Sequence, residues 1–223
     1  MKNLPGGEMS SRILNFYWVA DVSGSMEGEK IQQLNYAIRQ VLPDMKKEAD
    51  QNPNATVMVR SLKFSTGASW VEPTATDVHN FSWTDLSAAG VTDMGTALKM
   101  LATEFASFKT DIKALPPVIV MLTDGQPIDD YKAGITELLA TPWGKKSIRV
   151  GIAIGKDADV TVLEEFTGNS ELVLRANNPE QLVKFIKWAS TLVKSASMPT
   201  VGDNLPVVDT STIPVATNND DVW

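Results

Sequence analysis

Short apolar runs alternate along most of the chain with segments of helical periodicity. Runs rich in branched and aromatic residues predict β-strands at 13–20, 56–64, 118–122 and 148–154, with a weaker one at 171–175. Apolar side chains recurring every three or four residues predict helices at 30–42, 97–105, 128–139 and 179–193. Strands that alternate with helices indicate a layered α/β domain with a mostly parallel central sheet and helices on both faces.

Three local signals refine this pattern. Pro43 is expected to end or bend the first helix, because proline lacks the N–H that the helix needs. Gly67 allows a tight turn into residues 68–71, the best candidate for an antiparallel edge strand. Asn178 followed by Pro179 is a typical helix start.

The periodicity stops near residue 195. Residues 195–223 are rich in Ser, Thr, Asn, Asp and Pro, which predicts a flexible or loosely packed tail after a folded domain at 12–194. Residues 1–11 form an N-terminal extension without the apolar core of a signal peptide. No apolar run approaches the roughly 20 residues needed to span a bilayer, so a cytoplasmic protein is expected.

Composition excludes several chemistries. The chain of 223 residues has no cysteine and one histidine, His79, which removes disulfides, thiolate metal sites and multi-histidine zinc sites. Its net charge of −7 argues against nucleic acid or an anionic membrane as the partner.

Candidate metal ligands follow two of the predicted strands. The first strand runs into Asp21, Ser23 and Ser25, in the pattern D-x-S-x-S, and the strand at 118–122 runs into Asp124. A third loop, ahead of a helix, offers the hydroxyl of Thr92. Ligands of open parallel sheets bind beyond the carboxyl ends of the strands, so these five oxygen side chains are expected to converge there.

The oxygen atoms of these side chains favour particular divalent ions. Carboxylate and hydroxyl oxygens suit Mg²⁺, Mn²⁺ or Ca²⁺, and Mg²⁺ is the first expectation. Mg²⁺ takes six ligands in octahedral geometry, so five crowded side chains leave at least one position facing solvent. An Asp or Glu of a protein partner would complete that position.

These motifs, in this order, resemble the von Willebrand factor A (vWA) domain and its metal-ion-dependent adhesion site (MIDAS). The resemblance covers roughly residues 12–194, and it implies a strand order 3-2-1-4-5-6 with strand 3 antiparallel at the edge. Residues 86–98 and 116–130 further resemble TerY-type proteins of bacterial tellurium-resistance and stress systems. That narrower match implies a PP2C-type phosphatase and a protein kinase as partners, although Val91 and Ile128 replace a usual glycine and threonine.

Three alternative interpretations concern the same residues. An EF-hand loop needs Gly and Glu where this chain has Met26 and Gln32, so that interpretation fails. A haloacid-dehalogenase-like phosphatase would use Asp21 as nucleophile and would need an acid where Ser23 stands. A purely structural metal, with the partner docking elsewhere, stays open. The expectation is a non-enzymatic, metal-dependent interaction module.

Overall fold

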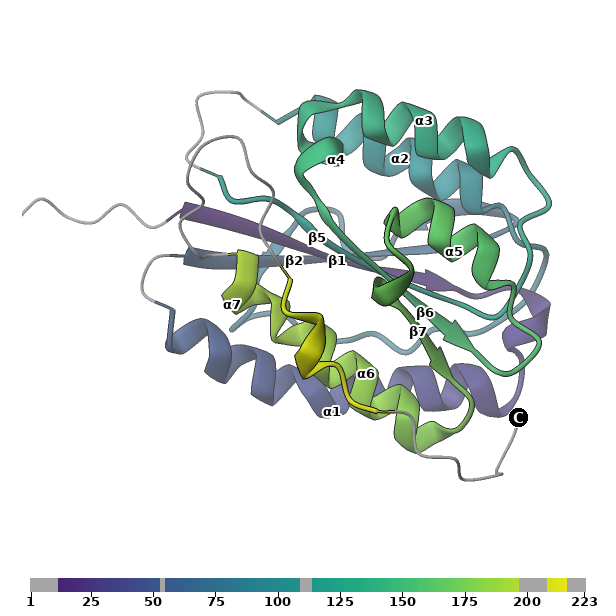
Figure 1. Ribbon diagram of the computed structural model, residues 1–223, viewed down its shortest axis with the longest axis horizontal. Coiled ribbons are helices and arrows are strands. Elements are labelled where there is room, and N and C mark those ends of the chain that lie inside the picture. The colour runs from purple at the N-terminus through teal and green to yellow at the C-terminus, as the bar shows by residue number, and fades with distance from the viewer. Residues whose placement is uncertain (1–11, 53–54, 109–113, 197–207, 216–223) are drawn as a thin grey trace, which may run out of the picture.

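A single mixed sheet lies between two layers of helices in the computed structural model, which describes residues 12–52, 55–108, 114–196 and 208–215 (Figure 1). The strands are β1 (Arg12–Asp21), β2 (Ala55–Ser65), β3 (Gly67–Trp70), β4 (Thr76–Asp77), β5 (Val118–Thr123), β6 (Ile148–Ile154) and β7 (Val173–Ala176). Within this described part, no helix is both long and apolar enough to cross a membrane.

The strand order is β3-β2-β1-β5-β6-β7, as the resemblance implied. Strand β1 pairs in parallel with both β2 and β5, and β6 and β7 continue the parallel sheet. Gly67, with φ of 75°, turns the chain so that β3 runs antiparallel along β2, and the short β4 also pairs antiparallel with β2. The strand order changes direction between β1 and β5, so this is the topological switch point.

Two helical layers cover the sheet (Figure 1). One layer holds α2 (Met94–Ala106), α3 (Tyr131–Ala140), α4 (Pro142–Lys146) and α5 (Val160–Thr167). The other holds α1 (Glu29–Asp50), α6 (Pro179–Ser190) and α7 (Leu192–Ala196). Short 3₁₀ turns lie at Gly24–Met26, Ser170–Leu172 and Thr210–Thr212.

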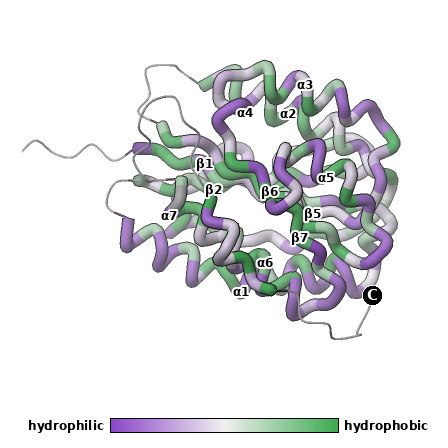
Figure 2. The backbone as a smooth tube through the Cα atoms, viewed as in Figure 1, coloured by the Kyte–Doolittle hydropathy of each residue, from purple (hydrophilic) through white to green (hydrophobic). Residues whose placement is uncertain are grey.

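The sheet separates the apolar core into two clusters, and the central strand β1 contributes side chains to both. Phe16 and Trp18 point into the cluster beneath α1 and α6, whereas Tyr17 and Val19 point into the cluster beneath α2. Successive residues of a strand face opposite sides of the sheet, so a continuous apolar run fits a strand covered on both faces. Figure 2 shows the result as apolar strands inside and polar stretches on the outer helices.

Pro43 does not end the first helix, which is one of the two outcomes that the sequence predicts for it. Helix α1 continues through Pro43 to Asp50, with Met45 and Ala49 buried beyond the proline. An interior proline costs a helix about 3 kcal/mol. Burial of the last two turns against α6 and α7 offsets that cost.

Other helix predictions need correction as well. Helix α3 begins at Tyr131, three residues after the predicted start, and α5 was not predicted at all. Lys145 and Lys146 form the last turn of α4, a short helix that the pattern does not predict. The predicted helix 179–193 is interrupted at Thr191, so that its end belongs to α7.

Asn35 is one of the α1 residues that hold the polar stretch 72–90 against this helix. Asn35 accepts hydrogen bonds from Trp83 Nε1 and Leu86 N, both at 2.9 Å, and its amide donates to Leu86 O. Trp83, Leu86 and Phe81 are buried in the core cluster beneath α1. This anchoring fixes the segment that leads into the Thr92 loop.

Part of the predicted tail packs on the domain. Val208 and Ile213 contact the core cluster beneath α1, and Trp188 Nε1 of α6 donates to Thr212 Oγ1 at 3.0 Å. Residues 197–207 and 216–223, together with the extension 1–11, lie outside the described residues. The proposed domain boundaries therefore stay a prediction.

Candidate functional site

The D-x-S-x-S turn follows directly from the end of β1. The Asp21 carboxylate accepts a hydrogen bond from Ser23 N at 2.8 Å through one oxygen and from Thr123 Oγ1 at 2.5 Å through the other. The Ser23 and Ser25 hydroxyl oxygens lie 3.0 Å apart. Two strand ends, β1 and β5, thus share the Asp21 carboxylate.

Asp124 closes the cluster from the end of β5. Its Oδ1 accepts a hydrogen bond from Ser25 Oγ at 2.7 Å, whereas its Oδ2 forms an ion pair with Lys30 Nζ. Lys30 reaches the site from the first turn of α1, and its side chain passes Gly155 at the end of β6. One carboxylate oxygen therefore faces the serine hydroxyls and the other faces a cation.

Thr92 completes the set from the third loop. A methyl group on Gly125 would lie 3.3 Å from Thr92 Oγ1 and 3.5 Å from Ser25 Oγ, which places both hydroxyls around the same glycine. Backbone hydrogen bonds hold the loops together, from Gly24 N to Gly90 O at 2.9 Å and from Ile128 N to Thr92 O at 3.0 Å. All five predicted ligands thus gather at the switch point between β1 and β5.

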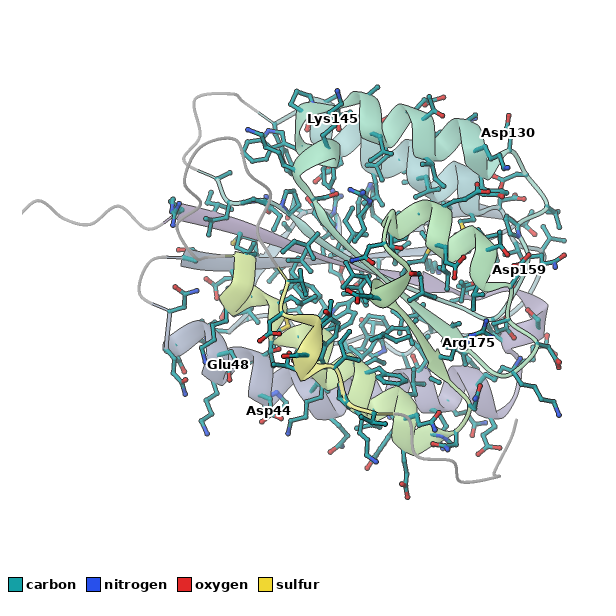
Figure 3. The ribbon with its side chains drawn as sticks, viewed as in Figure 1. Asp44, Glu48, Asp130, Lys145, Asp159 and Arg175 are labelled. Atoms are coloured by element: carbon teal, nitrogen blue, oxygen red, sulfur yellow. The ribbon has the colours of Figure 1, made fainter. Side chains whose placement is uncertain are left out.

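The cluster is buried except on one side. Asp21, Ser23, Thr92 and Asp124 are at most 7% exposed, whereas Ser25 is exposed. In Figure 3, Asp130 and Asp159 mark the end of the molecule where β5 and β6 terminate. Gln126, in the loop after β5, donates to Asp159 Oδ2 at 3.2 Å and links that loop to the start of α5.

Burial dominates the electrostatics of Asp21. Loss of solvent raises the pKa of Asp21, the hydrogen bonds from Thr123 and Ser23 lower it, and the nearby Asp124 charge raises it further. Two buried carboxylates at one point are costly unless positive charge compensates them. Lys30 supplies one such charge, and a divalent cation would supply the rest.

The residues fit a hard divalent cation. Two carboxylates and three hydroxyls are oxygen donors of the kind that Mg²⁺ prefers. Within the described ranges, no three His, Cys, Asp or Glu side chains group as a metal site, so hydroxyl ligands distinguish this cluster from an all-carboxylate one. The exposed Ser25 leaves the cluster open to solvent on the side where an external ligand would enter.

Sequence reasoning missed Lys30 and Thr123. A lysine in the first turn of a helix opposes the helix dipole, which favours acidic residues there. This unfavourable position of a positive charge is the signal in the sequence that could have identified Lys30. No pattern pointed to Thr123, since a threonine at the end of a strand is common.

Neighbouring polar residues have structural roles. Asp129 accepts hydrogen bonds from Gly95 N and Thr96 N, both at 2.8 Å, and so caps α2. Asp130 caps α3 through Ala133 N at 3.0 Å. His79 lies 3.5 Å from Asp50 at the end of α1.

The fold recurs in solved structures of low sequence identity. The pilus adhesin SpaC of Lactobacillus rhamnosus GG, in an open conformation, gives a TM-score of 0.66 at 14% identity over 84% of this chain and 31% of that one. A von Willebrand factor type A protein of Catenulispora acidiphila gives 0.61 at 16% identity, over 83% and 43%. Proximal thread matrix protein 1 of the mussel byssus, with a zinc-occupied MIDAS motif, gives 0.58 at 14% identity, over 83% and 46%.

This chain therefore spans less than half the length of each of these three structures. No curated protein matches its sequence. The von Willebrand factor type A domain family matches residues 15–188, which contain all five residues of the oxygen cluster and most of the described fold. The chain belongs to the von Willebrand factor type A domain family.

Proposed function

We propose that this protein is a non-enzymatic interaction module that binds one divalent cation at Asp21, Ser23, Ser25, Thr92 and Asp124. The cation presents its open coordination position to a carboxylate of a protein partner. The observation that carries this proposal is the convergence of five oxygen side chains from three loops on a cluster open to solvent at Ser25. Membership in a family whose domains often serve as MIDAS-containing interaction modules supports it.

Mg²⁺ is the proposed ion. The donors are all hard oxygens, and Mg²⁺ readily keeps water in positions that the protein leaves open. Mn²⁺ and Ca²⁺ accept the same ligand types. The mussel structure carries zinc in its own MIDAS motif, so a site of this kind on this fold accepts a divalent ion in that protein.

Several features favour binding over catalysis. The single histidine lies against Asp50 at the end of α1. Among the contacts described, the one ammonium group that contacts the cluster is held by Asp124. A phosphatase of the haloacid-dehalogenase type needs a general acid two residues after its nucleophile, and Ser23 Oγ instead lies against Ser25 Oγ. That alternative predicts Mg²⁺-dependent release of phosphate from p-nitrophenyl phosphate, lost in Asp21→Asn.

A narrower setting is also proposed. Residues 86–98 and 116–130 resemble TerY-type proteins, which would place the module in a bacterial tellurium-resistance or stress-signalling system. Its partners would then be a PP2C-type phosphatase, a protein kinase, or both. The support is sequence resemblance in the two loops that carry Thr92 and Asp124.

Partner capture tests the proposal. The immobilised chain and its Asp21→Asn variant are exposed to native cell extract in Mg²⁺ and in EDTA, and the retained proteins are identified by mass spectrometry. We expect proteins that are retained only by the unmodified chain and only in Mg²⁺. Retention that survives both EDTA and Asp21→Asn would favour the rival account, in which the metal is structural and the partner docks elsewhere.

A further inference from the structure

Two exposed aliphatic side chains stand at the edge of the candidate metal site. Within the described residues, the large hydrophobic side chains that are exposed are Tyr36, Val91, Ile128 and Val215. Val91 is 42% exposed and directly precedes the ligand Thr92, and Ile128 is 67% exposed. Half of the exposed large hydrophobic residues in that part of the chain thus lie beside one proposed ligand.

The backbone holds these two side chains in place. Ile128 N donates to the Thr92 carbonyl oxygen at 3.0 Å, and the next residue, Asp129, caps the start of α2. Val91 N donates to Thr66 Oγ1 at 3.4 Å. Both side chains keep apolar surface in solvent on anchored loops. Exposed apolar surface rimmed by polar residues is typical of interaction sites.

The two sides of the site differ in character. Val91 and Ile128 flank Thr92, whose loop is tied to β2 through Asp93 N and Ser65 O at 2.8 Å. Lys30 approaches from the other direction, past Gly155 at the end of β6. With a divalent cation bound, Lys30 also leaves the centre positively charged overall, which favours an anionic ligand.

We infer that Val91 and Ile128 form an apolar rim of the metal site. This rim selects a partner segment in which an Asp or Glu stands beside an aliphatic or aromatic residue. The inference rests on the proposed function. The carboxylate would take the open position of the cation, while the adjacent apolar side chain packs on Val91 and Ile128.

A random peptide library tests the inference. Peptides are selected on the full chain in Mg²⁺, released with EDTA and sequenced, and the selected peptides are titrated against three proteins in Mg²⁺. These proteins are the unmodified chain, the double variant Val91→Ser/Ile128→Thr, and the control Tyr36→Ser, which truncates an exposed apolar side chain on α1. Mg²⁺ affinity of each protein is measured separately by calorimetry.

We expect the selected peptides to carry an acidic residue with an apolar neighbour. They should bind the double variant about tenfold more weakly and the Tyr36→Ser control unchanged, while all three proteins keep the same Mg²⁺ affinity. Acidic peptides without an apolar preference, equal binding to the double variant, or no EDTA-released peptides from a chain that binds Mg²⁺ would each overturn the inference. Absence of Mg²⁺ binding by the unmodified chain would instead defeat the proposed function, and the inference with it.

Discussion

Lys30 and Asp124 form an ion pair that leaves only one oxygen of the carboxylate facing the serine hydroxyls. The Asp124 side chain is 1% exposed and that of Lys30 is 23% exposed, so the pair is shielded from solvent on the carboxylate side. A fixed positive charge beside a proposed ligand repels a cation that binds there, and it compensates the buried carboxylates when no cation is present.

Lys30→Met should tighten Mg²⁺ binding by about tenfold, or roughly 1.4 kcal/mol. Removal of the ammonium group removes its repulsion of the ion. The same variant should lower the free energy of unfolding in EDTA by about 1–3 kcal/mol, because Asp124 loses its partner. Calorimetry with Mg²⁺ and urea denaturation in EDTA measure the two effects.

Lys47→Met provides the matched control. Lys47 lies in the last turn of the same helix, at the end remote from the site, and the substitution removes the same charge. We expect its Mg²⁺ affinity to stay within about twofold of the unmodified chain. Equal changes in both variants would show that net charge, and not the contact with Asp124, sets the affinity.

Asp21→Asn should change how stability depends on pH in the absence of metal. Burial raises the pKa of Asp21, so the folded chain holds that proton more tightly than the unfolded chain does. The stabilisation is complete below the unfolded pKa of about 4 and is lost as the pH rises through the raised folded pKa. Relative to Asp21→Asn, the unmodified chain should therefore lose stability as the pH rises above about 4.

The asparagine can keep the local hydrogen bonds. Its oxygen can accept from Ser23 N, and its amide can donate to Thr123 Oγ1. Urea denaturation in EDTA at several pH values gives the difference directly. A difference that is constant with pH would show that Asp21 does not carry a raised pKa.

Gly125→Ala should weaken Mg²⁺ binding by at least about tenfold with little loss of stability. The added methyl group would stand 3.3 Å from Thr92 Oγ1 and 3.5 Å from Ser25 Oγ, between two proposed ligands. Gly125 does not have a positive φ, so alanine fits its backbone without strain. Calorimetry measures the Mg²⁺ affinity, and thermal denaturation in EDTA measures the stability. An undiminished Mg²⁺ affinity would place the ion away from these hydroxyls.

Asp129→Ala should reduce both stability and Mg²⁺ affinity. The substitution removes the acceptors for Gly95 N and Thr96 N at the start of α2, a loss of about 1–2 kcal/mol. Because α2 begins just after Thr92, a frayed first turn also loosens that ligand. Denaturation and Mg²⁺ titration measure the two losses.

Asp130→Ala is the control for that prediction. It removes the neighbouring cap, which serves α3 through Ala133 N, so its cost in stability should be similar. Its Mg²⁺ affinity should stay unchanged, since α3 carries none of the proposed ligands. Loss of affinity in both variants would point to general destabilisation.

Much of this arrangement could be predicted from sequence because strong local signals agreed. The strand at 118–122 is a continuous apolar run, and the antiparallel β3 follows a glycine with positive φ, so pattern and turn chemistry indicated the same elements. The convergence of the five candidate ligands could be predicted because the residue types and their places after strands are informative together.

Other features depend on contacts between distant segments. Helix α1 passes through Pro43 because its later turns are buried against α6 and α7, which local propensity does not record. Asp129 caps α2 and not the helix that follows it, and Lys30 meets Asp124 across 94 positions of sequence. Such pairings follow only once the strand order is known.

Magnesium titration tests the central claim most directly. The chain is stripped with EDTA, dialysed and titrated with Mg²⁺ by calorimetry, beside Asp21→Asn and Asp124→Asn variants whose folding is checked by circular dichroism. The account predicts one ion bound per unmodified chain and no measurable binding to either folded variant. No binding to the unmodified chain, or full binding to both variants, would contradict it.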